Sequence, residues 1–297
     1  MKLKMHYLIL SVFVFFMLAN MEAHAQKAWG SNYKYTYESG TTTVELTENV
    51  EIYSPIRLKK GATLIIKNVS NQTISNAMAA NSSTTCMFKV DAGATLKILG
   101  RRENNKDYKI IIDGGADFPE WSSSIGFDTN VAKKTLDACI VNQGYFTLEY
   151  GCIQNVCALD PREDDSENRK GGAININGKS CSKTNITHSI IRKCQAAEGS
   201  AILIDSRNDT GSTPPDDCKV TIRYSKIHYC HATDKGGGTI RTYGSTVANL
   251  HMYGDTLQYN KSQDGAGLYW NAHGHKDTKC TIDGCIFRHN FASHRGG

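Results

Sequence analysis

The sequence predicts an all-β solenoid with coils of about 30 residues. Three observations support this prediction. Glycine-led apolar segments recur at residues 171, 199, 237 and 265, and a fifth begins at 296. Each of them follows a short segment that ends in Cys or Asn, and no long stretch shows the periodicity of a helix. Because one such coil cannot enclose a core, its apolar side chains are expected to pack against neighbouring coils.

The segments before the glycines place one Cys or Asn in each coil. These residues are Cys157, Cys194, Cys230, Asn260 and Asn290. Their intervals of 37, 36, 30 and 30 residues fit one repeat if the polar stretches 158–170 and 206–217 are surface loops. A second shared position holds Cys152, Ser189, Ser225, Asp255 and Cys285.

The cysteines alternate with Asn, Ser and Asp at these positions, so we expect ladders of small side chains at turns and mostly free thiols. The alternative is a disulfide between neighbouring coils, either Cys157 to Cys194 or Cys194 to Cys230. Such a bridge would fit the spacing of adjacent rungs, which is about 4.8 Å. No His pair accompanies the cysteines at zinc-site spacing, so no metal site is predicted.

Residues 1–25 are typical of an export signal. Lys2 and Lys4 precede an apolar stretch from Leu8 to Leu18, and Ala23-His24-Ala25 forms a cleavage site. An uncleaved anchor is the alternative, but the apolar run is shorter than the roughly 20 residues of a spanning helix. We therefore expect an exported protein, at the cell surface or extracellular, without a membrane span after cleavage.

The rest of the chain is expected to be one elongated domain. Residues 26–40 are a candidate N-terminal cap, and residues 41–297 are the predicted β-helix. The string GATL at 61 and at 93 leads into alternating strands of the first coils. Because Gly296 and Gly297 stand where another strand should begin, we expect the domain to continue beyond residue 297. The net charge of +5 is spread along the chain, so a nucleic acid is not an expected partner.

The repeats resemble two families. The GATL strings, and the later pairing of a segment ending in Asn or Cys with a glycine-led strand, resemble right-handed parallel β-helix repeat proteins exported by Bacteroidetes-type bacteria. FRHN at 287 with GG at 296, and GGAI at 171, are similar to the FxxN and GGA[ILV] repeats of chlamydial polymorphic outer-membrane adhesins. The resemblance covers roughly residues 41–297. It implies a right-handed parallel β-helix of the pectate-lyase-like superfold, secreted or on the cell surface, and no catalytic residue.

Strand alternation predicts two outward rows after the glycines. The first row holds Asn175, Leu203, Arg241 and Tyr269, the second holds Asn177, Asp205, Tyr243 and Asn271, and His273 flanks both in a loop. Tyrosine rings stack on pyranose rings, while Asp, Asn and Arg hydrogen-bond hydroxyl or carboxylate groups. All of these residues except Leu203 are therefore candidates for binding a glycan or host-surface ligand. The alternative is an ordinary solvated sheet face.

The predicted function is that of an adhesin-like surface module that binds glycans. The first alternative is a carbohydrate-active enzyme, a polysaccharide lyase or a glycoside hydrolase, which would need paired carboxylates or Ca²⁺ held by several of them. Acidic residues are too sparse in the two rows to assign a catalytic residue or a cofactor, and Ca²⁺ is expected only with a lyase. The second alternative is a structural spacer. The oligomeric state is left open.

Overall fold

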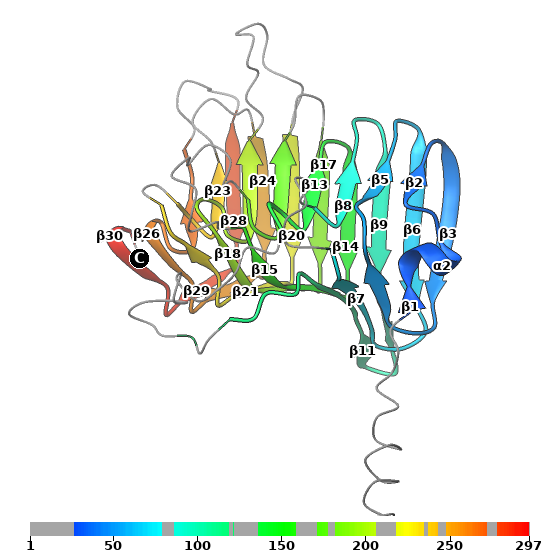
Figure 1. Cartoon of the computed structure of the whole chain (residues 1–297). Coiled ribbons are helices and arrows are strands. Elements are labelled where there is room, and N and C mark those ends of the chain that lie inside the picture. Colours follow the sequence, from blue (N-terminus) through cyan, green and yellow to red (C-terminus); the bar gives the residue numbers. More distant parts are fainter. Residues whose placement is uncertain are drawn as a thin grey trace, which may run out of the picture.

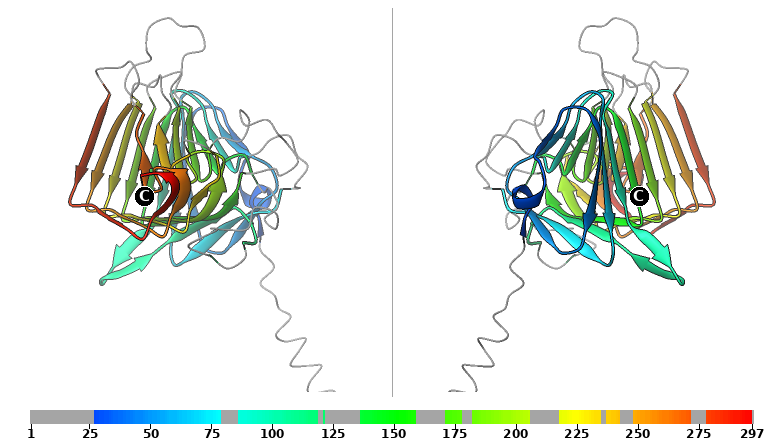
Figure 2. Two further views of the ribbon diagram at one scale, coloured as in Figure 1. Left: turned by 90° about the vertical axis from the view of Figure 1, so that its left-hand side faces the viewer. Right: turned by 90° about the vertical axis from the view of Figure 1, so that its right-hand side faces the viewer.

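The structure, a computed structural model, describes residues 27–78, 86–118, 121, 136–158, 171–177, 182–205, 218–234, 237–242, 248–271 and 278–296. These residues form a right-handed parallel β-helix, which confirms the predicted fold. The coils stack along one axis, from α2 and β3 at one end to β30 at the other (Figure 1). Figure 2 views the stack from both ends, where the sheets surround a common interior.

Three parallel sheets run along the axis, and each coil contributes strands to sheets A, B and C in turn. Sheet A contains β1 (Lys27–Ala28), β4 (Val50–Ile52), β7 (Gln72–Asn76), β12 (Ile110–Asp113), β15 (Gly151–Cys157), β18 (Ile190–Ala196), β21 (Lys226–His228), β22 (His231–Ala232), β25 (Thr256–Gln258), β26 (Lys261–Asp264), β29 (Ile286–Arg288) and β30 (Phe291–Arg295).

Sheets B and C each have eight strands. Sheet B contains β2 (Thr36–Tyr37), β5 (Ile56–Leu58), β8 (Phe88–Val90), β13 (Ile140–Asn142), β16 (Ile174–Asn177), β19 (Ile202–Asp205), β23 (Ile240–Thr242) and β27 (Leu268–Tyr269). Sheet C contains β3 (Gly40–Leu46), β6 (Ala62–Asn68), β9 (Thr95–Leu99), β14 (Tyr145–Glu149), β17 (Lys183–Thr187), β20 (Cys218–Arg223), β24 (Ala248–Tyr253) and β28 (Lys279–Asp283).

Two elements lie outside these sheets. Strands β10 (Arg101–Glu103) and β11 (Lys106–Tyr108) form an antiparallel hairpin. Helix α2 (Trp29–Asn32) buries Trp29, whose Nε1 donates a hydrogen bond to the carbonyl of Lys34 at 3.0 Å. The part of the chain that the structure describes contains no helix with the length and apolarity of a membrane span.

The interior is filled by apolar rows that repeat from coil to coil. In sheet B the row Ile140, Ile174, Ile202 and Ile240 is paired in register and fully buried. Each such side chain contributes about 1.5–3 kcal/mol to stability by leaving water. Because successive residues of a strand point to opposite faces, the residues between the apolar positions form equally regular outward rows.

The coils from β15 onward turn at two corners that use the left-handed backbone conformation. The first corner has positive φ at Tyr150, His188, Tyr224, Gly254 and Gly284, and the second, five residues later, at Asn155, Lys193, Tyr229, Tyr259 and His289. This conformation is unfavourable for residues other than Gly, Asn and Asp. Stacking of the corner rings offsets part of that cost. For example, Tyr150 and His188 have ring centroids 5.0 Å apart, and Tyr229 and Tyr259 have theirs 5.3 Å apart.

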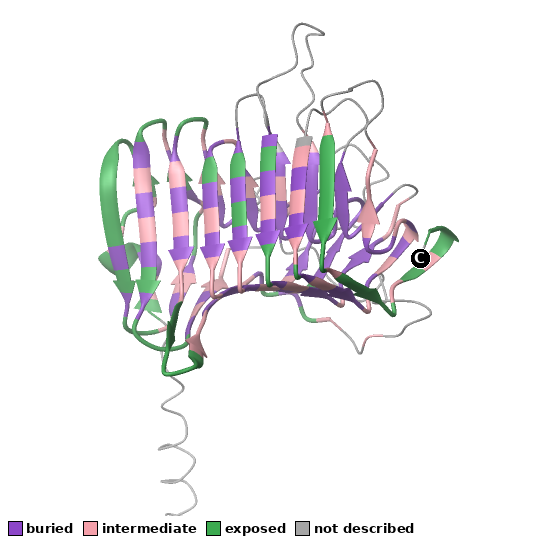
Figure 3. Ribbon diagram, turned by 180° about the vertical axis from the view of Figure 1, so that it is seen from behind, coloured by how far each residue is buried: buried purple, intermediate pink, exposed green. Residues whose placement is uncertain are grey.

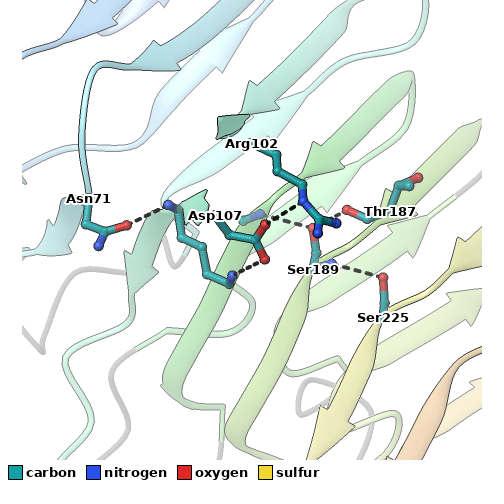
Figure 4. A network of polar contacts seen from close by, with 8 residues as sticks. Asn71, Arg102, Asp107, Thr187, Ser189 and Ser225 are labelled. Carbon is teal, nitrogen blue, oxygen red and sulfur yellow. Dashed lines mark hydrogen bonds and ion pairs between the residues drawn. The ribbon is translucent and has the colours of Figure 1, made fainter. Parts of the chain in front are cut away.

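The residue after the first corner has a side chain that accepts a hydrogen bond from the previous coil. The N–H of Gly151 donates to Ser189 Oγ at 3.1 Å, that of Ser189 to Ser225 Oγ at 3.1 Å, and that of Ser225 to Asp255 Oδ1 at 2.8 Å. The Ser189 hydroxyl donates in turn to the Thr187 carbonyl at 2.7 Å (Figure 4). These side chains accept hydrogen bonds from backbone N–H groups at the corner, where the backbone turns out of the parallel sheet. Cys152 was predicted at this position, but Gly151 occupies it, and Cys152 pairs with Ile190 one residue later.

A second ladder follows the second corner. The N–H of Cys230 donates to Asn260 Oδ1 at 3.0 Å, and the N–H of Asn260 donates to Asn290 Oδ1 at 3.1 Å. Cys194 lies on the same row, since Gln195 pairs with His231. Burial raises the pKa of the Cys194 thiol well above its usual value, so it stays protonated at neutral pH. Cys194 and Cys230 are thiols, not a disulfide.

Cys157 was predicted on this row but lies one residue beyond it. Val156 pairs with Cys194, and Cys157 pairs with Gln195, so the interval between these coils is 38 residues and not 37. Cys157 packs in a small separate cluster with Ala116 and Ala197. The physical reason is that the two corners are five residues apart in both coils, so Tyr150 aligns with His188 and Asn155 aligns with Lys193. Val156, which follows Asn155, therefore aligns with Cys194.

Asp255 makes the stability of the first ladder depend on pH. Burial raises the pKa of its carboxyl to about 6, although the N–H groups of Ser225 and Tyr253 donate to it and act in the other direction. Because the folded-state pKa lies above the unfolded value, the stability contributed is complete at low pH and is lost as the pH rises through about 6.

We therefore expect the free energy of unfolding to fall, between about pH 4 and pH 7, by on the order of 1–2 kcal/mol more in the wild type than in Asp255→Asn. The variant keeps an acceptor oxygen but cannot ionise. Urea unfolding at a series of pH values measures both proteins. Parallel pH profiles would show that the Asp255 carboxyl does not control this dependence.

Candidate functional site

The predicted ligand-binding residues of sheet B share rows as far as the structure describes them. Asn175, Leu203, Arg241 and Tyr269 pair in register on successive coils. Asn177 pairs with Asp205. The backbone N–H of Asn271 donates to Thr242 Oγ1 at 2.8 Å. Tyr243 and His273 lie outside the described residues, as does the side chain of Asn177.

The glycine-led turns fold back over this row of sheet B. Gly171 has a φ of +87°, and a Cβ there would lie 2.8 Å from Cβ of Asn175. Gly199 has a φ of +56°, and a Cβ there would lie 2.8 Å from Cβ of Leu203. Only glycine fits this conformation and this approach, which explains the glycines at these two positions. Leu203 is consequently 1% exposed, so the row is not the open strip that strand alternation predicts.

Arg241 is also buried, and its charge is already compensated. It is 8% exposed, and its Nη1 lies 2.8 Å from a carboxylate oxygen of Glu198. The guanidinium carbon lies 5.3 Å from the ring centroid of Tyr269. Removing one partner of such a pair leaves a buried charge uncompensated, so Glu198 cannot easily be exchanged for a ligand. Arg241 therefore has a structural role in the row where an open ligand-binding residue was predicted.

A more open surface, which sequence reasoning did not predict, lies on the outer face of sheet C. Figure 3 views this sheet face on, with buried residues alternating with half-buried and exposed ones along its strands. We call the outward residues of β14, β17, β20, β24 and β28 the C face. The strand sequence KTNIT of β17 shows why it forms: Thr184 and Ile186 point inward and are buried, while Lys183 and Asn185 point outward and are exposed.

The C face has three rows, each paired in register. The first row is Tyr145, Lys183, Lys219, Asn249 and Lys279; the second is Thr147, Asn185, Thr221, His251 and Thr281; the third is Glu149, Thr187, Arg223, Tyr253 and Asp283. Cations, aromatic rings, amides and hydroxyls are thus brought together from segments that are 30 or more residues apart in the chain. The only acids, Glu149 and Asp283, lie at the two ends of the third row.

Aromatic rings on the C face lie beside cations. Tyr145 is 39% exposed, and the Lys183 ammonium lies 5.6 Å from its ring centroid. The Arg223 guanidinium lies 5.1 Å from the ring of Tyr253. Lys183, Lys219, Arg223 and Lys279 form no ion pair with any residue that the structure describes. These cations are therefore available to a ligand, unlike Arg241.

His251 is the titratable group at the centre of the C face. Its imidazole and the ring of Tyr253 are nearly parallel, with centroids 6.3 Å apart. Partial burial and then the nearby cations Lys219, Arg223 and Lys279 lower the pKa of this imidazole below its ordinary value. His251 is therefore neutral at neutral pH, and its pKa depends both on its burial and on the cations around it.

Neither a metal centre nor a known family identifies the site. Within the described ranges, no three His, Cys, Asp or Glu side chains are grouped so that they could hold a metal ion. No protein-family model matches the chain, and neither curated proteins nor solved structures give a significant match. The function is therefore inferred from the geometry and chemistry of the surface itself.

The buried pair gives a test of the structural role of Arg241. We expect Arg241→Met and Glu198→Gln each to lower the free energy of unfolding by about 3 kcal/mol, because each leaves a buried polar partner uncompensated. The double variant should lose clearly less than the sum of the two. Urea unfolding of the four proteins completes the cycle.

A matched control is available on the same row of sheet B. Arg57→Met removes an exposed cation and should change stability by no more than about 0.5 kcal/mol. Additive losses for Arg241→Met and Glu198→Gln, or an equal loss for Arg57→Met, would contradict the coupling of the pair.

Proposed function

We propose that this chain is an adhesin-like module, exported to the cell surface or beyond it, that binds glycans on the C face. The predicted export signal at 1–25 supports the location. The observation that supports the binding role is the flat, open C face, on which rings, amides, hydroxyls and uncompensated cations lie in register. A flat face suits an extended polymer better than a small molecule, which would need a concave site.

The residue types on this face match the chemistry of sugars. Pyranose rings have an apolar C–H face and a rim of hydroxyl groups. The exposed ring of Tyr145 and the half-buried ring of Tyr253 can pack against the first, and Asn185 and Thr221 can hydrogen-bond the second. An in-register face repeats these contacts along a chain of sugars, so weak single contacts add up.

Removal of a ring from the C face should weaken glycan binding. We expect Tyr145→Ala and Tyr253→Ala each to raise the Kd for a bound glycan roughly 5- to 10-fold, or about 1–1.4 kcal/mol. The ligand is found on a glycan array with the purified protein, and affinities are then measured by calorimetry.

Tyr269→Ala is the matched control, because this tyrosine lies on sheet B beside the buried Arg241. It should leave glycan affinity unchanged. Failure of the wild type to bind any glycan would refute the proposed function, and a selective loss with Tyr269→Ala would move the binding surface to sheet B.

A further inference from the structure

We infer that the C face selects a linear polysaccharide with about one anionic group per sugar unit, lying along the axis of the solenoid. This inference rests on the proposed glycan-binding function and adds the chemical class and the direction of the ligand. The observations that support it are the spacing of cations in the first row, the lack of partners for them and the position of His251.

The first row places cations on three of the four strands from β17 to β28. Strands β17, β20, β24 and β28 are consecutive in sheet C and contribute Lys183, Lys219, Asn249 and Lys279. Neighbouring rungs of a sheet are about 4.8 Å apart. This spacing is close to the length of one pyranose unit in an extended chain, so successive sugars can meet successive rungs. A polymer charged at each sugar therefore matches this row better than one charged at every second sugar.

The row is electrostatically unbalanced without a ligand. Like charges opposite each other on neighbouring strands destabilise a sheet, and Lys183 and Lys219 are such a pair. Exposed lysines usually relieve this repulsion by pairing with nearby acids, yet Lys183, Lys219 and Lys279 have no such partner among the described residues. A polyanion along the row would remove the repulsion from several rungs at once.

A sugar polymer fits this surface better than a nucleic acid. Three of the four cations, Lys183, Lys219 and Lys279, lie in the first row with hydroxyl and amide side chains beside them, and only two of the fifteen positions on the C face hold tyrosine. Binding of single-stranded nucleic acid relies on successive aromatic side chains on which the bases stack, along a basic groove. Asn185, Thr221 and Thr281 in the second row instead offer hydrogen bonds to hydroxyl groups.

Three forms of one polymer test the charge requirement directly. Chondroitin sulfate carries about one anionic group per sugar, desulfated chondroitin carries one per two sugars, and carboxyl-reduced desulfated chondroitin carries none. We expect the affinity of the full chain to fall roughly tenfold at each step in this order. Equal affinities for the three forms would overturn the inference. Tighter binding of the neutral form would overturn it as well and leave the proposed glycan-binding function standing.

Two lysine variants locate the contact. Lys183→Gln and Lys219→Gln remove the charge but keep a polar side chain, and should each weaken chondroitin sulfate binding roughly fivefold, with a salt dependence reduced by about one counterion. Lys89→Gln on sheet B is the matched control and should have no effect. Thermal unfolding checks that the variants fold, as expected for exposed lysines. An equal loss with Lys89→Gln would overturn the assignment to the first row.

Two further measurements separate the remaining outcomes. The imidazole signals of His251, followed by NMR, should shift when chondroitin sulfate binds, because the anion changes both the burial of this ring and the field of Lys219, Arg223 and Lys279. Unchanged His251 signals at saturation would place the ligand elsewhere. Single-stranded DNA that binds as tightly as chondroitin sulfate, with the same lysine dependence, would overturn the selection of a polysaccharide. If none of the three polymers binds and a glycan array also shows nothing, the proposed function itself fails.

Discussion

In-register stacking of parallel coils is the constraint on which the rest of this structure depends. Each strand hydrogen-bonds to the coils on both sides, so a residue type that suits one coil must also suit its neighbours. At the corners the left-handed backbone interrupts these backbone hydrogen bonds. Side chains accept the N–H groups of the preceding coil instead: those of Ser225 and Asp255 at the first corner, and those of Asn260 and Asn290 at the second. The same register that fills the interior with isoleucine rows also aligns the outward side chains.

The two outward surfaces differ because of the chain that precedes each strand. Before sheet B, glycine-led turns lie against the outward row, and Arg241 is buried beside Glu198. No described segment covers the C face in this way, and Lys183 and Lys219 remain exposed without acidic partners. Arg241 is therefore buried in an ion pair within the protein, whereas Lys183 and Lys219 are exposed and can bind an anionic ligand. The repulsion between neighbouring lysines is then a cost in stability that ligand binding can relieve.

The repeats were sufficient to predict the fold and the glycine positions, but not the accessibility of the rows. Alignment of cysteine with cysteine put Cys157 one residue out of register. Alignment of the apolar residues Ile153, Ile191, Ile227 and Leu257, which pair in the structure, would have avoided the error. The C face was missed for a different reason. Its strands share an alternation but few letters, and Lys183, Lys219 and Lys279 are too far apart in the sequence to form a visible basic cluster. They come together only in the folded protein, where they occupy the same position on strands of successive coils.

NMR of reductively ¹³C-methylated lysines, which keep their charge, tests most directly whether the first row of the C face contacts the glycan. Each lysine gives its own signal, and single Lys→Arg variants assign it. During titration of the wild-type protein with chondroitin sulfate oligosaccharides, the signals of Lys183, Lys219 and Lys279 should shift together and saturate, while that of Lys89 on sheet B stays in place. Saturable shifts confined to sheet B, or none on the C face when the ligand is bound, would contradict this assignment of the binding surface.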